Sequence, residues 1–380
     1  MKVILAPDSF KGSLTALEAA KAMATGIHEF DSFIHTVLLP VADGGEGTMK
    51  SLVDATNGKI VYVDVQDPLG RPIKAGYGVL GDGETCIIEF AEASGLMLLT
   101  ASERNPMEAS SFGTGEVIKH ALNDRYRKFI IGLGGSATND GGAGMLQALG
   151  MRFLDIAGME LPIGGEGLFN LQRIDNSNFD KRIASSEFIL ACDVKNPFVG
   201  STGASAVFGP QKGASSEMVK LLDRSLTQFA DIVEKLTGIS LHSKKGAGAA
   251  GGAGGAFQAF FGCTMSQGID VVLNAISFDA HVKSANLILT GEGKTDVQTL
   301  SGKTPFGVAK VAHRESIPII LISGAVDEEC RESLMSMFDE IHALTDDSVS
   351  SEEAIEHAFH LLQKKTKVVF EDYIKNRIGV

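Results

Sequence analysis

Four short apolar runs in this chain each end in a polar cluster that contains both glycine and aspartate. The pairs are VILA with PDSFKGS, VLLPVA with DGGEGT, LILT with GEGKTD, and IILIS with GAVDE. Continuous apolar runs of this length are typical of strands that are buried on both faces of a parallel sheet. Helical patterns separate several of the runs, so the sequence predicts right-handed strand–helix–strand units and a doubly wound α/β sheet.

The two ends of the chain supply the elements of this sheet. We expect strands at residues 3–6, 36–41, 287–289, 319–322 and 341–344, and five short strands match a flavodoxin-like domain. A capping box of Thr15 and Glu18 marks the start of the first helix. Further helices are expected from about Thr48, at residues 306–314, and, as one long amphipathic helix, at residues 352–374.

The middle of the chain follows another pattern. Strands at residues 60–66, 73–80 and 85–89 follow one another closely, and residues 216–236 form a strong amphipathic helix pattern. Because single hydrophobic cores stop growing at roughly 250 to 300 residues, a chain of 380 residues is expected to form two domains. We therefore predict a second α/β domain inserted into the first.

Composition excludes several classes of function. The net charge of -13 would repel nucleic acid and anionic membranes, so neither is an expected partner. No apolar stretch approaches the roughly 18 residues that a membrane-spanning helix needs, and the first residues are too briefly apolar for a signal peptide. The 4 cysteines lie far apart without a CxxC pair, which favours a reducing cytoplasm over a disulfide framework or a zinc site.

The polar clusters are candidates for a ligand site. In open α/β sheets, ligands bind beyond the carboxyl ends of the strands, so the four clusters are expected to face one crevice. Asp8 offers a contact to a metal or hydroxyl, and Lys11 offers a compact positive charge for phosphate. Asp43 and Glu46, separated by two glycines, fit a magnesium or phosphate site. The alternative is that these residues only form turns or favour a helix N-terminus.

The segment GLGGSATNDGG at residues 132–142 predicts an anion site. It follows an apolar strand and precedes a helical run, and its glycines let backbone amides approach a ligand closely. Small polar residues also cap helices, so a purely structural role stays open. Asp193 ends another apolar run, FILAC, and is a candidate base.

Six segments together resemble the glycerate kinase type I family. They are DSFKGS, PVADGGEGT, DPLGRP, GLGGSATNDGGAGML, CDVKNPFVGSTGASAVFGPQKGA and TGEGKTDVQTLSGKTP, and the resemblance covers essentially the whole chain. It implies ATP-dependent phosphorylation of D-glycerate, with 2-phosphoglycerate as the expected product. It also implies a flavodoxin-like domain from both chain ends (residues 1–70 and 285–380) and an inserted, restriction-enzyme-like α/β domain (residues 71–284), with the active site in the cleft between them. The family more often has arginine where this chain has Lys294.

These patterns lead to a set of residue roles. We expect Lys11 and the residues 134–139 to hold phosphate oxygens, Asp193 to orient the glycerate hydroxyl and accept its proton, and Arg71 or Lys294 to pair with the glycerate carboxylate. The expected catalytic residues are Asp193 and Lys11; the substrate- or phosphate-binding residues are Asp8, Ser9, Arg71, Gly134, Gly135, Ser136, Thr138, Asn139 and Lys294; the Mg²⁺ ligands are Asp43, Glu46 and Asp296.

Three alternatives stay open at this stage. The product could be 3-phosphoglycerate, the substrate could be a related hydroxy acid, or the chain could be a non-catalytic two-lobed sensor of an organic acid. A sensor would explain a cleft but not the repeated carboxylates. The expected partners are the small molecules D-glycerate and ATP, and whether copies of the chain associate into a homo-oligomer is open.

Overall fold

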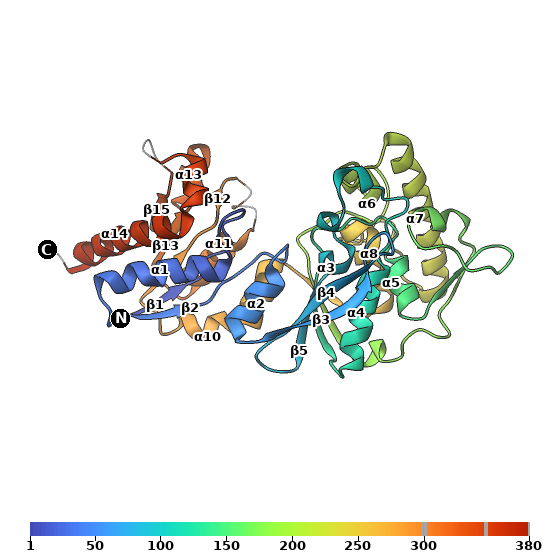
Figure 1. Ribbon diagram of the computed structural model, residues 1–380, viewed down its shortest axis with the longest axis horizontal. Coiled ribbons are helices and arrows are strands. Elements are labelled where there is room, and N and C mark those ends of the chain that lie inside the picture. The colour runs from blue at the N-terminus through green and yellow to red at the C-terminus, as the bar shows by residue number, and fades with distance from the viewer. Residues whose placement is uncertain (298, 300–301, 346–348, 379–380) are drawn as a thin grey trace. The chain divides into compact units, whose positions relative to one another are not determined.

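The computed structural model describes residues 1–297, 299, 302–345 and 349–378, and its ribbon is drawn in Figure 1. It separates into two compact units. Unit 1 comprises residues 1–43, 50–57 and 269–380, and unit 2 comprises residues 44–49 and 58–268. Unit 1 therefore contains both ends of the chain. The domain boundaries expected after residues 70 and 284 stay a prediction.

Unit 1 is built around a five-stranded parallel sheet. Its strands are β1 (Lys2–Leu5), β2 (His35–Leu38), β11 (Leu287–Thr290), β13 (Ile319–Ser323) and β15 (Glu340–Ala343), and its helices of eight or more residues are α1 (Ala16–Phe30), α2 (Thr48–Thr56, which begins in unit 2), α9 (Gly268–Ala275), α11 (Thr304–Arg314) and α14 (Ala358–Ile378). Shorter elements are α10 (Phe278–Val282), β12 (Lys294–Thr295), β14 (Ala325–Val326), α12 (Arg331–Leu334) and α13 (Ser351–Glu356).

The strand order of this sheet is β15-β13-β11-β1-β2. Every neighbouring pair is parallel, and β1 lies between β2 and β11. In chain order this is the 2-1-3-4-5 arrangement of flavodoxin-like folds, whose ligands bind where the order reverses, between the first and third strands. The prediction of a doubly wound, flavodoxin-like sheet made from both chain ends is confirmed.

Local residues set the boundaries of the helices in unit 1. Thr15 and Glu18 form the predicted capping box, in which the Glu18 amide donates to Thr15 Oγ1 at 3.2 Å and the Thr15 amide donates to Glu18 Oε2 at 2.8 Å. Helices α1 and α14 pack side by side (Figure 1). The prediction of one helix over residues 352–374 is wrong, because His357 leaves the helical conformation, with φ -112° and ψ 22°, and separates α13 from α14.

Unit 2 holds a six-stranded mixed sheet in the order β10-β9-β6-β5-β4-β3. The strands are β3 (Lys59–Gln66), β4 (Pro72–Val79), β5 (Thr85–Glu89), β6 (Lys128–Gly132), β9 (Glu187–Ala191) and β10 (Thr264–Ser266), with β7 (Arg152–Leu154) and β8 (Arg173–Asp175) as a separate antiparallel pair. The helices are α3 (Ala91–Ser94), α4 (Phe112–Asn123), α5 (Ala143–Ala148), α6 (Ala204–Phe208), α7 (Ser216–Thr237) and α8 (Ala253–Phe260).

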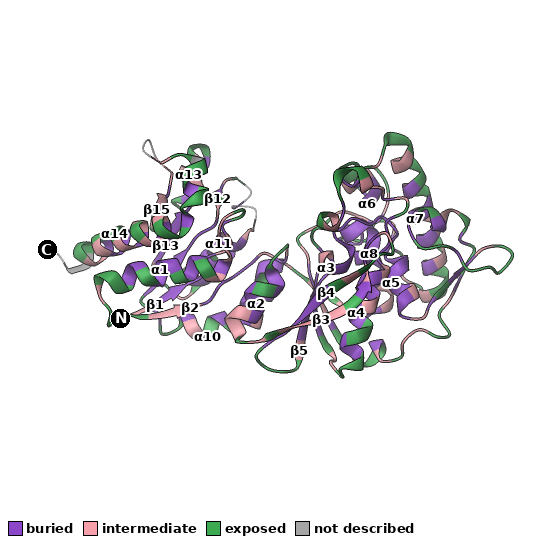
Figure 2. Cartoon of the chain, in the orientation of Figure 1, coloured by how far each residue is buried: buried purple, intermediate pink, exposed green. Residues whose placement is uncertain are grey.

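In this sheet β5, β6, β9 and β10 are parallel, whereas β3, β4 and β5 form antiparallel pairs. The central strands and the helix faces turned to them are buried (Figure 2). Aromatic rings fill part of the core, with Phe129 and Phe188 stacked at a centroid distance of 4.8 Å. The carboxyl ends of four parallel strands therefore meet at one edge, as the prediction of a second α/β domain requires.

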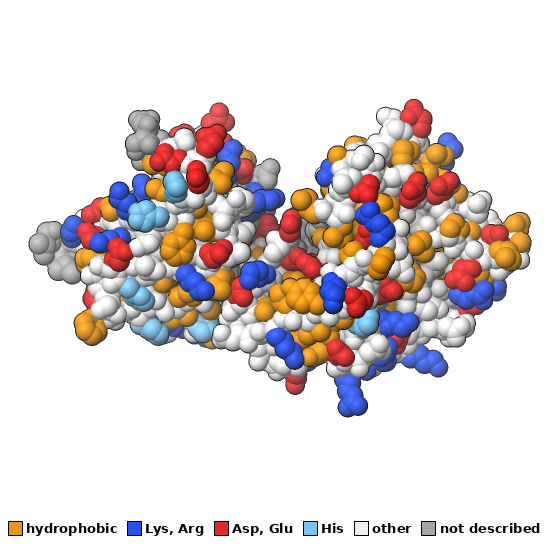
Figure 3. All heavy atoms as spheres, viewed as in Figure 1, with side chains coloured by type: hydrophobic (Ala, Val, Ile, Leu, Met, Phe, Trp, Pro, Cys, Tyr) orange, Lys and Arg blue, Asp and Glu red, His pale blue; other side chains and the backbone are white. Residues whose placement is uncertain are grey.

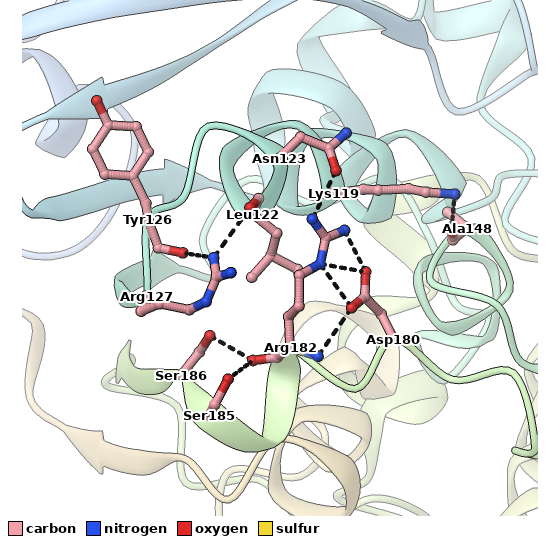
Figure 4. Close-up of polar contacts among 10 residues, drawn as sticks. All are labelled: Lys119, Leu122, Asn123, Tyr126, Arg127, Ala148, Asp180, Arg182, Ser185 and Ser186. Carbon is pink, nitrogen blue, oxygen red and sulfur yellow. Dashed lines mark hydrogen bonds and ion pairs between the residues drawn. The ribbon is translucent and has the colours of Figure 1, made fainter.

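The ends of two helices in unit 2 are held by basic side chains (Figure 4). Arg127 donates to the Leu122 carbonyl at the end of α4, and Lys119 donates to the Ala148 carbonyl at the end of α5. Arg182 forms a two-pronged contact with Asp180 and donates to Asn123 Oδ1 at 2.8 Å. Because every charge in this group has a protein partner, we assign it to stability rather than to ligand binding.

Acidic and basic side chains are interspersed on the face drawn in Figure 3. Among the described residues, none of the helices has the length and apolarity that crossing a membrane would require.

Candidate functional site

The carboxyl edge of the unit 1 sheet carries a group of acids, which we call the Asp8 cluster: Asp8, Asp43, Glu292 and the hydroxyl of Thr304. Asp8 follows β1 and Glu292 follows β11, the two strands at the point where the strand order reverses. Thr304 Oγ1 donates to Asp8 Oδ2, and the Ser9 amide donates to Asp8 Oδ1 at 2.6 Å. The structure thus brings two predicted residues, Asp8 and Asp43, together with Glu292 where the fold class places ligands.

Burial raises the pKa of Asp8 to about 7, and the nearby charges of Asp43 and Glu292 add to the rise, against the hydrogen bonds from Thr304 and Ser9. Burial also raises the pKa of Glu292, which accepts hydrogen bonds from Thr295 and Thr299 at 3.0 and 2.6 Å. Crowded carboxylates of this kind are typical of functional sites, because only a cation or a proton relieves their repulsion.

Two lysines lie beside this cluster in the chain. Lys11 and Lys294 are exposed and both line a pocket of about 230 Å³ in unit 1. Asp296, a predicted Mg²⁺ ligand, is half-buried and lies 3.9 Å from the ammonium of Lys303. Glu46 does not join this group within unit 1, because residues 44–49 belong to unit 2.

Residues 44–49, which we call the GGEG segment, run over the carboxyl ends of the unit 2 strands. Gly44 has φ +88°, and a Cβ there would lie 2.9 Å from Gly268 Cα and 3.2 Å from Ala191 Cβ. A Cβ on Gly134 would lie 3.2 Å from Gly45 Cα. Glycine is required at these positions because two backbone segments touch. Gly44 and Gly45, which were predicted to let the backbone approach a ligand, instead contact other loops of the protein.

Glu89, at the end of β5, holds the GGEG segment in place. Its carboxylate accepts hydrogen bonds from the amides of Met49 at 2.7 Å and Gly47 at 3.3 Å. Burial raises the pKa of Glu89 to about 7, and the charges of Glu92 and Glu46 contribute to the rise. A carboxylate directly after the apolar strand TCII is the same signal that marked the other clusters, yet sequence analysis passed over it.

The loop at residues 133–142, which we call the Gly134 loop, joins β6 to α5. Gly134 and Gly135 are exposed, whereas Ser136, Thr138 and Asn139 are buried, and Asn139 donates to Ser205 Oγ at 2.9 Å. The backbone of the two glycines, rather than the Thr138 and Asn139 side chains, is therefore what this loop presents at its surface.

The group bound at the start of α5 is a side chain of the protein itself, the carboxylate of Asp140. Asp140 accepts hydrogen bonds from the amides of Gly142 and Gly144 and from Ser111 Oγ, at 3.0, 3.2 and 2.7 Å. Ser111 Oγ in turn accepts from the Met145 amide at 2.9 Å. The first amides of the helix are thus satisfied within the chain, and the helix-capping alternative applies at this position.

Two further segments support the Gly134 loop from below. Lys212 is buried at 2% exposure and donates to Ser136 Oγ at 2.9 Å and to the Thr138 carbonyl at 2.7 Å. Burial lowers the pKa of Lys212 to about 7. A Cβ on Gly251, in the run GAGAAGGAGG at residues 246–255, would collide with the Thr138 carbonyl oxygen. That run is rich in small residues because its backbone packs directly on the loop.

Asp193 and Arg71 lie apart from the Gly134 loop contacts. Asp193 is exposed after β9, and its Oδ1 accepts a hydrogen bond from the Gly268 amide at 3.2 Å. Arg71 donates to Asp67 and to Glu103, each at 2.6 Å, so two protein carboxylates already occupy its guanidinium. The pairing of Arg71 or Lys294 with a substrate carboxylate stays a prediction.

The described residues contain no group of three or more histidine, cysteine, aspartate or glutamate side chains arranged to hold a metal ion. Mg²⁺ in phosphoryl-transfer sites is commonly held by one or two carboxylates, with substrate phosphates and water completing its six ligands. The crowded oxygens of the Asp8 cluster fit such a partial site. The assignment of Mg²⁺ to Asp43, Glu46 and Asp296 stays a prediction.

Comparison with known proteins identifies the family. A model described as the glycerate kinase family matches residues 3–373. The chain belongs to the glycerate kinase family. It is 47% identical over 367 residues to the glycerate kinase of Bacillus subtilis, covering 97% of this chain and 96% of that protein. It is 44% identical over 329 residues to the glycerate 2-kinase of Escherichia coli, covering 87% and 86%.

A solved structure agrees with the fold. A crystal structure named "putative glycerate kinase 2", from Salmonella typhimurium LT2, superposes with a TM-score of 0.91 at 42% identity and covers 99% of each chain. The resemblance to the glycerate kinase family and the prediction of a kinase are confirmed.

Two further charged residues besides Glu89 were not among the expected site residues. Glu292 was not among the expected site residues, although its place directly after β11 gives it the same standing as Asp8 after β1. Lys212 stands in the polar segment GPQKGA, which gives no local signal of burial.

Proposed function

We propose that this protein transfers the γ-phosphoryl group of ATP to D-glycerate, giving 2-phosphoglycerate and ADP. The observation that carries the proposal is the Asp8 cluster with Lys11 and Lys294 at the reversal point of the unit 1 sheet, in a chain whose relatives are named glycerate kinases. The Escherichia coli relative, named glycerate 2-kinase, supports the choice of hydroxyl.

Phosphoryl transfer depends mainly on positioning and on charge opposite the transferred group. Lys11, three residues after Asp8 in the chain, supplies a positive charge, and the exposed backbone of Gly134 and Gly135 supplies a surface that phosphate oxygens can approach. A bound Mg²⁺ would neutralise charge on the phosphates. Asp8 and Asp43 are the residues best suited to hold it, since their mutual repulsion is what a cation relieves.

Asp193 is proposed to orient the accepting hydroxyl and take its proton. It stands at the carboxyl end of β9, is exposed, and is held by the Gly268 amide. A kinase needs such a carboxylate because the hydroxyl must lose its proton as the new bond forms. Lys294 is proposed to pair with the glycerate carboxylate or a phosphate, since Arg71 is engaged by Asp67 and Glu103.

We also propose that the protein acts in the cytoplasm. Its four cysteines are free thiols, which supports a reducing compartment. The expectation that the substrates meet between the two parts of the chain stays a prediction.

The proposal is tested by measuring ADP release from ATP and Mg²⁺ by the full chain with a panel of acids: D-glycerate, L-glycerate, glycolate and lactate. We expect D-glycerate to give the largest kcat/KM. A higher kcat/KM for another acid would identify that acid as the substrate instead. If none of the acids causes ADP release but one of them binds tightly, the sensor alternative is favoured.

A further inference from the structure

The pocket of about 230 Å³ in unit 1 has a divided lining. Lys11 and Lys294 contribute two ammonium groups, whereas Phe10, Ala354 and Ile355 contribute apolar side chains. Ile355 is 53% exposed on α13, and Phe10 is almost fully buried behind the pocket wall. A site that offers both cations and an apolar wall suits a ligand with an anionic part and an apolar part.

The pocket lies at the carboxyl ends of four parallel strands. Its lining residues follow β1, β11, β13 and β15, and the loops are bonded to one another: the Ala325 amide donates to the Gly293 carbonyl and the Thr345 amide to the Gly324 carbonyl, both at 3.0 Å. A Cβ on Gly293 would lie 2.9 Å from the Lys11 amide nitrogen. These bonded loops therefore form a preformed wall that is partly backbone, at the edge where flavodoxin-like folds bind ligands.

The size of the pocket limits what it can hold. At about 230 Å³ it is smaller than the roughly 300–1,000 Å³ of pockets that take a whole drug-sized ligand, so it suits one heteroaromatic base rather than a whole nucleotide. Glycerate carries an oxygen on every carbon and would leave the apolar wall unused. A pocket of about 420 Å³ in unit 2 differs, because it lies at the amino ends of β5 and β6 and is lined by Lys128 and Glu84, which pair with each other at 2.7 Å.

We propose that this pocket is the base subsite of the phosphoryl donor: it receives the purine of a nucleoside triphosphate against Ile355 and Ala354, while Lys11 and Lys294 bind the phosphates that leave its mouth. The inference rests on the proposed function, because it assigns the donor of that same reaction to one place. It also gives Lys11 and Lys294 a shared role, since the phosphates pass both lysines on the way to the Asp8 cluster.

The test separates the two halves of the ligand. Binding of adenosine, of tripolyphosphate and of the non-hydrolysable analogue AMP-PNP to the full chain is measured by calorimetry or by competition. Ile355→Glu places a carboxylate on the apolar wall at an exposed helical position, where the fold tolerates it. Val368→Glu, at a 49% exposed position of α14 outside the pocket, is the matched control.

We expect Ile355→Glu to weaken adenosine and AMP-PNP binding by about tenfold or more and to weaken tripolyphosphate binding less, through the added charge alone. Lys294→Met should do the opposite, weakening tripolyphosphate and AMP-PNP but not adenosine. Val368→Glu should change none of the three. Nucleotide binding that is unchanged in Ile355→Glu, or an equal loss of adenosine and tripolyphosphate binding, would overturn the inference.

Failure of the inference can be told apart from failure of the proposed function. If the wild-type chain phosphorylates glycerate but Ile355→Glu binds AMP-PNP normally, the base lies elsewhere and only the inference fails. If AMP-PNP binding shows the expected pattern but glycerate is never phosphorylated, the donor subsite stands and the acceptor is wrong. If the wild-type chain binds no AMP-PNP, both are rejected.

Discussion

Replacing Lys212 with methionine removes a buried ammonium from beneath the Gly134 loop at almost constant side-chain length. In the folded chain this ammonium donates to Ser136 Oγ and to the Thr138 carbonyl, and burial lowers its pKa from 10.5 to about 7. At 1.36 kcal/mol for each pKa unit, keeping Lys212 charged in the folded state costs roughly 5 kcal/mol relative to water, a net cost that already includes the opposing charge of Asp140.

The sign of the pH effect follows from that lowered pKa. Between pH 7 and about pH 10 the unfolded chain keeps the Lys212 proton and the folded chain does not, so raising the pH favours the folded state. The free energy of unfolding of the wild-type protein should therefore rise, relative to Lys212→Met, by about 2 kcal/mol between pH 7 and about pH 9. The hydrogen bonds lost in Lys212→Met change the difference in free energy of unfolding by the same amount at every pH. The slope of that difference against pH therefore reports only the titration of Lys212.

Urea unfolding at several pH values and constant ionic strength measures this slope. The chain has no tryptophan, and of its 4 tyrosines Tyr62, Tyr77 and Tyr126 lie in unit 2, so tyrosine fluorescence reports mainly on the unit that contains Lys212. Lys220→Met, which removes an exposed lysine of α7, is the control and should track the wild-type protein. A wild-type-minus-Lys212→Met difference that stays flat across this range would refute the argument from burial.

Three further substitutions test the site. Asp193→Asn should lower kcat by about 10²–10⁴-fold while the nucleotide Kd, measured by calorimetry, changes by less than about twofold. If kcat and nucleotide affinity fall by the same factor, Asp193 is not the base. Asp8→Asn should be less active but more stable at neutral pH, because the folded wild-type protein holds the Asp8 proton up to about pH 7 and so loses stability as pH rises from about 4. A difference in the free energy of unfolding, wild type minus Asp8→Asn, that stays constant or rises over that range would contradict this. Glu89→Gln should speed hydrogen exchange at the amides of Gly47 and Met49, which its carboxylate now holds; unchanged exchange there would show that the segment is held by other contacts.

The sequence predicted best what local patterns decide. Buried parallel strands such as Ile319–Ser323 are continuous apolar runs, and the Thr15 capping box depends on residues only three positions apart. Asp8 and Asp43 could be expected at one edge because parallel strands end on the same side of their sheet, and the same rule applied to β11 would have added Glu292.

What the sequence could not predict depends on contacts between distant segments. No local signal shows that residues 44–49 join unit 2, because Gly44 is held by Ala191 and Gly268, far away in the chain. Asn139 is a residue type that ligand-binding loops often use, but a small polar side chain is also common inside a protein when it has a partner, as the Asn139 amide has in Ser205 Oγ. The polar residues next to Lys212 in the sequence predict an exposed side chain. It is buried because the Gly134 loop packs over it.

The product of the reaction tests the central claim most directly. The full chain is incubated with ATP, Mg²⁺ and D-glycerate, and the new phosphate ester is observed by proton-coupled phosphorus NMR. Phosphate on the middle carbon couples to one carbon-bound proton and gives a doublet, which is the signal that we predict for 2-phosphoglycerate. A triplet would place the phosphate on the terminal carbon and contradict the assigned hydroxyl, and the absence of any ester while ATP stays intact would contradict a glycerate kinase.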